Sequence, residues 1–151
     1  LHSTSRRQRQ MCIRDRLTSI KLDNIFLSDG NVKVFECVSE GGSINLNFKD
    51  KYSFSESESN ACFIASFKLD GIIGEQENAE KLFTISGEFK VRYSKLKEVT
   101  ITKDFFDVFK EISLSVFIWP YFREYIQNMI VRTGLPSFTL PAKIYGVHDP
   151  Q

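Results

Sequence analysis

Alternating hydrophobic and polar residues mark out a series of β-strands in the first two thirds of the chain. Between residues 83 and 93, apolar and aromatic side chains alternate strictly with polar and charged ones, which is the period of a strand with one buried face. Residues 44–48 show the same alternation, which can extend to Phe54, and residues 17–28 and 61–73 are further strand candidates. The polar face of the 83–93 strand indicates an antiparallel sheet with one side exposed to water. Segment 61–73 is apolar on both faces, which is typical of a central strand or one covered by a partner.

Small and turn-forming residues separate these segments. Asp29-Gly30-Asn31 has the chemistry of a turn, and residues 53–60 and 74–81 are expected to form solvated loops. Residues 32–38 are apolar but less regular. Their pattern fits an irregular connection and an extension of the first strand equally well.

The last third of the chain has the three- and four-residue spacing of a helix. Thr102 predicts an N-cap before a helix that begins at residue 103, and Gly134, two residues before Pro136, predicts the C-cap. Pro120 is expected to start or bend a helix, because proline lacks an amide hydrogen and crowds the preceding turn. One stripe of this helix is expected to be buried: Phe105, Phe109, Ile112 and Val116.

One motif in this last third is specific enough to suggest a family. The run Trp119-Pro120-Tyr121-Phe122-Arg123-Glu124 is followed by Leu135-Pro136 and Leu140-Pro141. This order resembles the SecB family of protein-export chaperones, whose long helix carries such a run before a proline-containing apolar segment. The resemblance implies an α+β fold: a four-stranded antiparallel sheet followed by a long, proline-interrupted helix, over a domain of residues 17–146 with a tail at 147–151.

The resemblance also implies a function and an assembly. SecB-like proteins are cytoplasmic holdases that bind unfolded preproteins without ATP and keep them competent for export, usually as a dimer or tetramer. The helix here is apolar around most of its circumference, which is typical of burial on several sides and agrees with a homo-oligomer. Five residues of the motif are expected to anchor the helix in that oligomer: Trp119, Pro120, Tyr121, Arg123 and Glu124.

Two further sets of site residues follow from the family layout. A client-binding groove is expected between the crossover of the first two strands and the segment after the long helix, although each of its residues could equally belong to the core. Its candidates are Phe35, Val38, Ile44, Leu46, Leu135, Phe138 and Leu140. In the family, an acidic sheet face docks the translocation ATPase SecA. Here Asp23, Asp70 and Glu88 are the candidates for that face, and nearby lysines and an arginine reduce its negative charge.

The first 16 residues do not fit this picture. They hold five arginines and no periodic apolar pattern, and they resemble translated sequencing-adapter DNA. We expect this segment to be a non-native, disordered leader rather than a basic arm for nucleic acid. Without it, 15 basic and 18 acidic residues remain and the net charge changes from +1 to −3, which argues against a nucleic-acid partner.

Catalytic and cofactor chemistry has few candidates in this sequence. The body holds one histidine, His148, and the cysteines Cys37 and Cys62 lack CxxC spacing. No nucleotide-binding loop, dinucleotide fingerprint or metalloprotease motif is present, and no apolar run is long enough to cross a membrane. We therefore expect a non-enzymatic binding protein without a cofactor or metal.

Two alternatives to a general export chaperone stay open. One is a SecB-like chaperone dedicated to an antitoxin of a toxin–antitoxin pair. The other is a structural protein that uses the same sheet and helix only to oligomerise.

Overall fold

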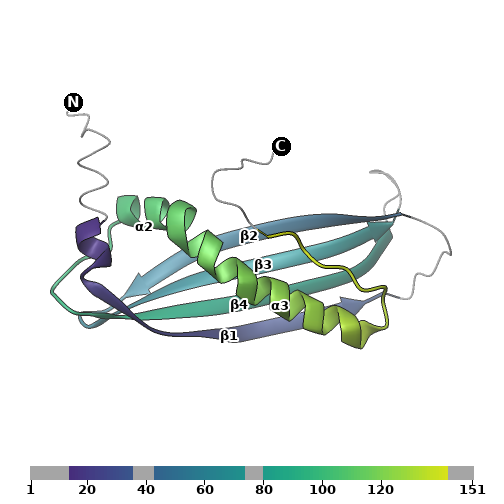
Figure 1. Ribbon diagram of the computed structural model, residues 1–151, viewed down its shortest axis with the longest axis horizontal. Helices are drawn as coiled ribbons and strands as arrows, with labels where there is room; N and C mark the ends of the chain where they lie inside the picture. The colour runs from purple at the N-terminus through teal and green to yellow at the C-terminus, as the bar shows by residue number, and fades with distance from the viewer. Residues whose placement is uncertain (1–13, 36–42, 74–79, 143–151) are drawn as a thin grey trace, which may run out of the picture.

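A single antiparallel sheet forms one layer of the molecule (Figure 1). The computed structural model describes residues 14–35, 43–73 and 80–142. The strands are β1 (Ile20–Val34), β2 (Ile44–Glu56), β3 (Asn60–Ile73) and β4 (Glu80–Lys95). Their spatial order is β1-β4-β3-β2, so the first two strands lie at opposite edges and β3 and β4 are central. The predicted four-stranded antiparallel sheet is confirmed.

Strand β1 runs through the residues predicted to form a turn. The prediction of a turn at 29–31 is wrong, and Val32–Val34 extend the first strand. Two register shifts interrupt the pairing of β1 with β4 and let several apolar side chains keep facing the helix despite their irregular spacing. Gly30 lies opposite Gly87 in β4, and the ring of Tyr125 occupies the space above both glycines. Gly30 therefore serves close packing rather than a turn.

The connection between β2 and β3 is shorter than expected. Alternation continues through Phe54, and β2 ends at Glu56, so only residues 57–59 separate the two strands. The prediction of a loop from residue 53 is therefore wrong. Phe54 explains the difference, because it packs against Phe106 of the helix with ring centroids 4.7 Å apart and so belongs to the sheet.

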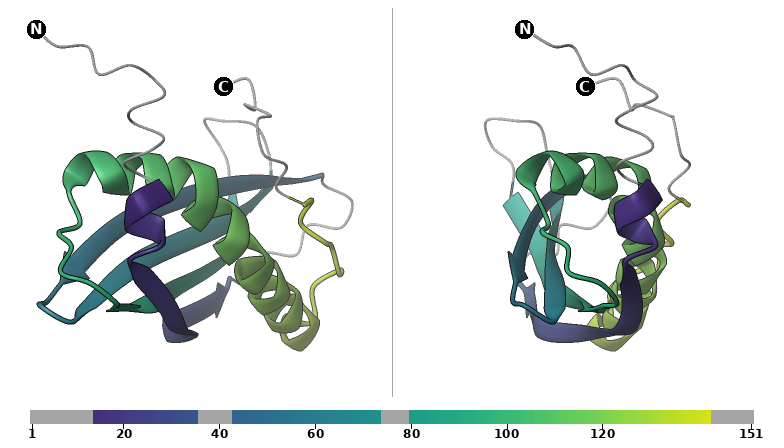
Figure 2. Two further views of the ribbon diagram at one scale, coloured as in Figure 1. Left: turned by 60° about the vertical axis from the view of Figure 1, so that its left-hand side comes forward. Right: turned by 90° about the vertical axis from the view of Figure 1, so that its left-hand side faces the viewer.

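The second layer is one helix that crosses the sheet diagonally (Figures 1 and 2). It consists of α2 (Lys103–Phe109), a π-helical segment η1 (Lys110–Leu114) and α3 (Ser115–Thr133). The predicted caps are confirmed: Thr102 accepts a hydrogen bond from the backbone of Phe105, and Gly134 adopts a left-handed φ of 75°. Pro120 lies inside α3, so no helix starts there. The helix changes direction along its length (Figure 2), and both η1 and Pro120 are common causes of such bends.

The π-helical segment changes which residues the helix buries. The expected stripe is wrong after Phe109, because Ile112 is 41% exposed and Val116 is only partly buried. Leu114 and Ile118 take their places and are fully buried. The step from Phe109 to Leu114 is five residues, which is the spacing of a π-turn.

The N-terminal segment predicted to be a disordered leader is described only from residue 14. There the chain forms a helical turn over residues 14–17. The Arg16 guanidinium donates a hydrogen bond to Thr102 Oγ1 (2.9 Å) and lies 5.9 Å from the ring centroid of Phe105. The expectation of disorder covered residues 1–16, and the structure differs from it at residues 14–16.

Candidate functional site

One end of the sheet exposes apolar side chains on the face that carries the helix. The pairing register places Val34, Phe83, Gly71 and Leu46 in one row across all four strands. Val34 is 43% exposed and Leu46 is 44% exposed, at the two ends of this row. Ile44 follows at the start of β2 and is 39% exposed. We call Val34, Leu46, Gly71 and Phe83 the terminal apolar row.

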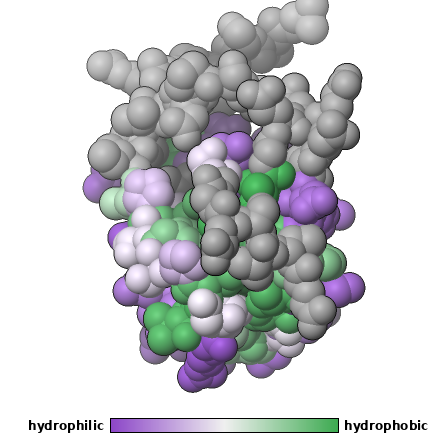
Figure 3. Space-filling model, turned by 90° about the vertical axis from the view of Figure 1, so that its right-hand side faces the viewer, coloured by the Kyte–Doolittle hydropathy of each residue, from purple (hydrophilic) through white to green (hydrophobic). Residues whose placement is uncertain are grey.

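The middle of the terminal apolar row is closed by aromatic packing. The Phe83 ring lies over Gly71 so closely that a Cβ there would be 2.1 Å from Phe83 Cε1. Phe138, from the segment after the helix, stacks on Phe83 with ring centroids 6.0 Å apart. The centre of the terminal apolar row is therefore covered, and Val34 and Leu46 expose an apolar side chain on either side of it. The surface of the molecule here shows apolar patches between polar side chains (Figure 3).

Two residues of the helix motif hold the segment after the helix in place. Trp119 Nε1 donates to the backbone oxygen of Pro141 (2.8 Å), and Arg123 Nε donates to that of Leu140 (2.8 Å). Leu140 itself is buried. Because these bonds lie within one chain, Trp119 and Arg123 position Phe138 at the terminal apolar row.

The other motif residues face away from the core. Pro120 is exposed, and Tyr121 is 45% exposed. Glu124 is exposed and accepts a hydrogen bond from Asn128 one turn later. These three residues are available to a neighbouring molecule, whereas Trp119 and Arg123 are used internally.

Six of the seven predicted groove residues separate into three groups. Ile44, Leu46 and the half-buried Leu135 and Phe138 lie at the end of the sheet or directly after the helix. Leu140 belongs to the core, so it cannot contribute surface. Val38 lies outside the described residues.

Phe35 lies on the polar face of the sheet, away from the terminal apolar row. Its neighbour Val34 was not predicted to be a groove residue. The Lys33 ammonium is 5.2 Å from the Phe35 ring centroid, and Lys33 pairs with Thr84 on the polar face of the sheet. Val34, on the helix face, is instead the residue of β1 that joins the terminal apolar row. Only the register across the sheet reveals this, because residues 32–38 have no clear alternation.

The candidate acidic residues lie on the polar face of the sheet, and each already accepts a hydrogen bond from a residue of the same chain. Asp70 is buried, accepts a hydrogen bond from Thr84 Oγ1 (2.6 Å) and is 3.8 Å from the ammonium groups of both Lys68 and Lys81. Glu88 accepts from Ser28. Asp23 accepts from Ser94 Oγ (2.5 Å).

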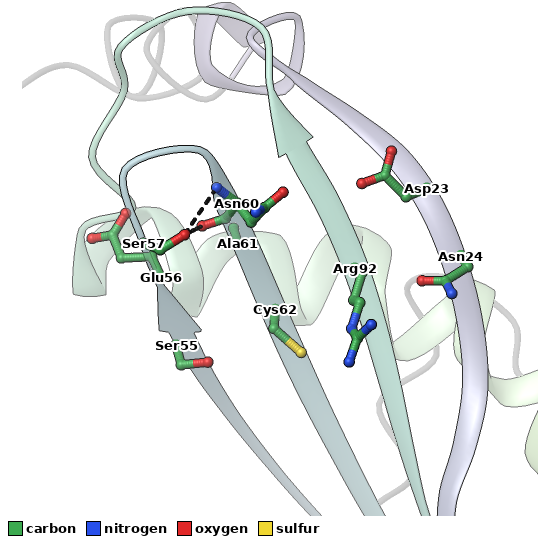
Figure 4. Close-up of a pocket in the computed structure, with 9 residues that line it drawn as sticks. All are labelled: Asp23, Asn24, Ser55, Glu56, Ser57, Asn60, Ala61, Cys62 and Arg92. Atoms are coloured by element: carbon green, nitrogen blue, oxygen red, sulfur yellow. Dashed lines mark hydrogen bonds between the residues drawn. The ribbon is translucent and has the colours of Figure 1, made fainter.

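A polar hollow of about 550 Å³ lies at the other end of the sheet (Figure 4). Its lining includes Cys62, Arg92 and Asp23, together with the hairpin residues Ser57 and Asn60, which hydrogen-bond to each other. Neither histidine lies in the described chain. Among the described residues, no histidine lies beside Cys62 as the base of a nucleophile–base pair.

Metal-ligand clusters and membrane-spanning helices are two further features that can be checked in the described residues. Within residues 14–35, 43–73 and 80–142, no group of three or more His, Cys, Asp or Glu side chains could hold a metal ion. No helix in these ranges is long and apolar enough to cross a membrane.

One titratable group with a raised pKa lies farther along β2, away from the terminal apolar row. Tyr52 in β2 donates a hydrogen bond to Asp50 Oδ2 (3.0 Å). Burial, and then the negative charge of Asp50, raise the pKa of Tyr52 above its ordinary value. Its phenol therefore stays protonated and remains a donor at neutral pH.

Comparison with known proteins identifies the fold. No protein-family model and no curated protein matches this chain in sequence. Among solved structures, the SecB-like chaperone Rv1957 of Mycobacterium tuberculosis, in complex with a ChAD peptide from the antitoxin Rv1956 HigA1, is similar with a TM-score of 0.73 and 17% identity. That similarity covers 93% of this chain and 99% of the chaperone.

A second solved structure is much less similar. A protein of unknown function from Streptococcus agalactiae reaches a TM-score of 0.40 at 14% identity, over 81% of this chain and 96% of that one, which is too low to carry an argument. The first comparison supports the four-stranded antiparallel sheet followed by a long helix described above. The chain therefore has the fold of SecB-like chaperones.

Proposed function

We propose that this protein is an ATP-independent chaperone that holds non-native polypeptides at the terminal apolar row. The observation that carries the proposal is the exposure of Val34 and Leu46 on either side of Phe83 and Phe138. Apolar burial is nondirectional, so such a surface can hold many unrelated sequences. The shared fold with a chaperone that binds a peptide supports this reading.

The client class has two candidates. The motif around Trp119 favours unfolded preproteins kept competent for export in the cytoplasm. A dedicated antitoxin client is the second candidate, because Rv1957 is in complex with an antitoxin peptide. We do not extend the proposal to SecA, because Asp23, Asp70 and Glu88 are engaged within the chain.

We also propose that the protein forms a homo-oligomer. The helix exposes large apolar side chains that the sheet does not cover: Ile112, Tyr121 and Val131, the last of them 68% exposed. Burying such side chains against a second copy removes apolar surface from water. Whether the oligomer is a dimer or a tetramer depends on how much of this surface one copy covers.

Light scattering tests the holdase function. An unrelated protein that refolds slowly is diluted from denaturant with and without this chain, in the absence of nucleotide. We expect the wild type to suppress aggregation, and Val34→Asp/Leu46→Asp to lose most of that effect. Leu96→Asp is the matched control, because Leu96 is 61% exposed but follows β4 at the opposite end of that strand from Phe83.

Either of two results would defeat the proposal. Aggregation that is unchanged by the wild type would leave an oligomerising structural protein as the better interpretation. Suppression that survives in the double variant would place the binding surface elsewhere.

A further inference from the structure

The two edges of the sheet differ in how well they can accept another strand. The pairing of β1 is interrupted by two register shifts, whereas β2 pairs with β3 from Ile44 to Glu56 without one. Bulges twist a strand and break up the regular row of backbone groups that an added strand needs. Only three of the 13 residues of β2 are even partly shielded: Phe48, Tyr52 and Phe54. In the described chain, β2 is the regular and exposed edge (Figure 1).

The polar face of β2 is positively charged. Lys49 and Lys51 are exposed on this face, and Lys49 lies directly opposite Lys68 of β3. Lys68 is 3.8 Å from Asp70, but neither Lys49 nor Lys51 has an ion pair among the described residues. Like charges on opposite strands are unfavourable. A carboxylate placed beside Lys49 and Lys51 would therefore be stabilised.

The helix-side face of β2 requires different neighbours. Leu46 and Phe48 present apolar surface, and Phe48 packs edge-on against Trp119 with ring centroids 5.1 Å apart. Asp50 follows on the same face and accepts the hydrogen bond of Tyr52. A charged side chain on the inner face of an edge strand disfavours strands that do not complement it. An added strand should therefore be apolar, and not acidic, on this face.

We propose that β2 receives a client as an added strand, and that the preferred client is an amphipathic extended segment. Its carboxylates lie beside Lys49 and Lys51, and its apolar side chains lie beside Leu46 and Phe48. This inference rests on the proposed chaperone function and specifies its client. The edge lysines also repel basic strands, so one pair of residues both protects the edge from them and selects the client.

Peptide binding tests the predicted pattern. Three labelled peptides of equal length are compared by fluorescence anisotropy at low salt: Glu alternating with Leu and Phe, Lys in place of Glu, and the Glu peptide with its alternation scrambled. We expect the alternating Glu peptide to bind about tenfold more tightly than the others, because cross-strand attraction replaces repulsion at two positions. Equal binding of the alternating Glu and Lys peptides would overturn the proposal.

Charge reversal locates the binding edge. Lys49→Glu/Lys51→Glu should reverse the preference in favour of the Lys peptide. Lys21→Glu/Lys33→Glu makes the same change on the polar face of β1, at the opposite edge, and should leave the preference intact. A reversal by the β1 variant, or none by the β2 variant, would exclude β2 as the receiving edge.

Backbone methylation tests strand addition itself. Alternate amides of an added strand point towards β2, so of two peptides N-methylated at odd or at even positions, one should lose binding and the other keep it. Equal effects would overturn strand addition. If no peptide binds and aggregation is not suppressed, the proposed chaperone function fails as well. If all peptides bind equally while aggregation is suppressed, only the proposed addition of an amphipathic client strand to β2 fails.

Discussion

Two glycines decide how the helix sits on the sheet. Gly30 and Gly87 lie opposite each other in β1 and β4, and a Cβ at these positions would lie 2.7 Å from Tyr125 Oη and 3.1 Å from Tyr125 Cε1, respectively. Tyr125 Oη also donates to the backbone oxygen of Ser86 (2.9 Å). The ring therefore cannot move away from an added methyl group without losing a hydrogen bond.

Substitution of Gly30 tests this packing. We expect Gly30→Ala to lower the free energy of unfolding in urea by about 1–3 kcal/mol, the usual cost of overpacking. In a Tyr125→Ala background the same substitution should cost little, because the ring that it meets is gone. An equal cost in both backgrounds would mean that strand geometry, and not Tyr125, requires the glycine.

Glu56 links the β2–β3 hairpin to the start of the helix. Its carboxylate accepts hydrogen bonds from the backbone N–H of Ile101 (3.0 Å) and from Lys95 Nζ (2.8 Å). The Ile101 hydrogen bond, followed by the Lys95 hydrogen bond and charge, lowers the pKa of Glu56 below its ordinary value. Because the pKa is lower in the folded chain, this carboxylate stabilises the fold above its ordinary pKa, and that stabilisation is lost as the pH falls through the lowered value.

A pH series of urea unfolding measures this contribution. Glu56→Gln should be less stable than the wild type at neutral pH, and the difference should shrink as the pH falls below about 4.5. Glu58→Gln is the matched control, because Glu58 is an exposed carboxylate of the same hairpin. A difference that stays constant down to low pH would show that the charge of Glu56 does not matter.

At the scale of elements, the π-helical segment joins two buried helical faces. It places Leu114 five residues after Phe109, so that both contribute to the core. Phe109 packs against Phe63 of β3 with ring centroids 4.9 Å apart. Without the extra residue, the faces of α2 and α3 would differ by about 100° around the helix axis.

Deleting Ser113 tests the role of this segment. The deletion should turn the phenylalanines of α2 away from the sheet and lower the free energy of unfolding by at least the roughly 3–5 kcal/mol typical of losing one buried Phe. Ser113→Ala keeps the chain length and should change stability by less than about 0.5 kcal/mol. If the deletion is as mild as the substitution, the π-turn does not set the register of the helix.

The elements differ in how far the sequence predicts them. The strict alternation in β4 and the caps at Thr102 and Gly134 are local signals, and they predict the structure well. The wrong turn at 29–31 and the wrong stripe after Phe109 have long-range causes. Gly30 is required by Tyr125, which is distant in sequence, and a single π-turn breaks the periodicity on which the stripe was based.

At the scale of the whole molecule, the site depends on the register across four strands. Of the groove residues predicted from the sequence, Ile44 and Leu46 lie at this end of the sheet, Phe35 lies on the polar face with Lys33, and Leu140 is buried. No local pattern shows that Val34 and Leu46 end the same row, because they lie on the two edge strands.

Sedimentation tests whether the helix carries the oligomer interface. Ile112→Glu/Val131→Glu places charges on exposed apolar positions and should reduce the mass of the particle while far-ultraviolet circular dichroism stays unchanged. Leu96→Glu, at an equally exposed apolar residue outside the helix, should leave the mass unchanged. A monomeric wild type, or an unchanged mass in the helix variant, would contradict the proposal.

The most direct test of the chaperone account is photo-crosslinking from the terminal apolar row. A photoreactive residue is placed at Leu46 or at Leu96, both exposed, and the protein is irradiated with an unfolded client in the absence of ATP. The account predicts a client adduct from position 46 and little from position 96. Equal labelling at both positions, or none from position 46, would contradict it.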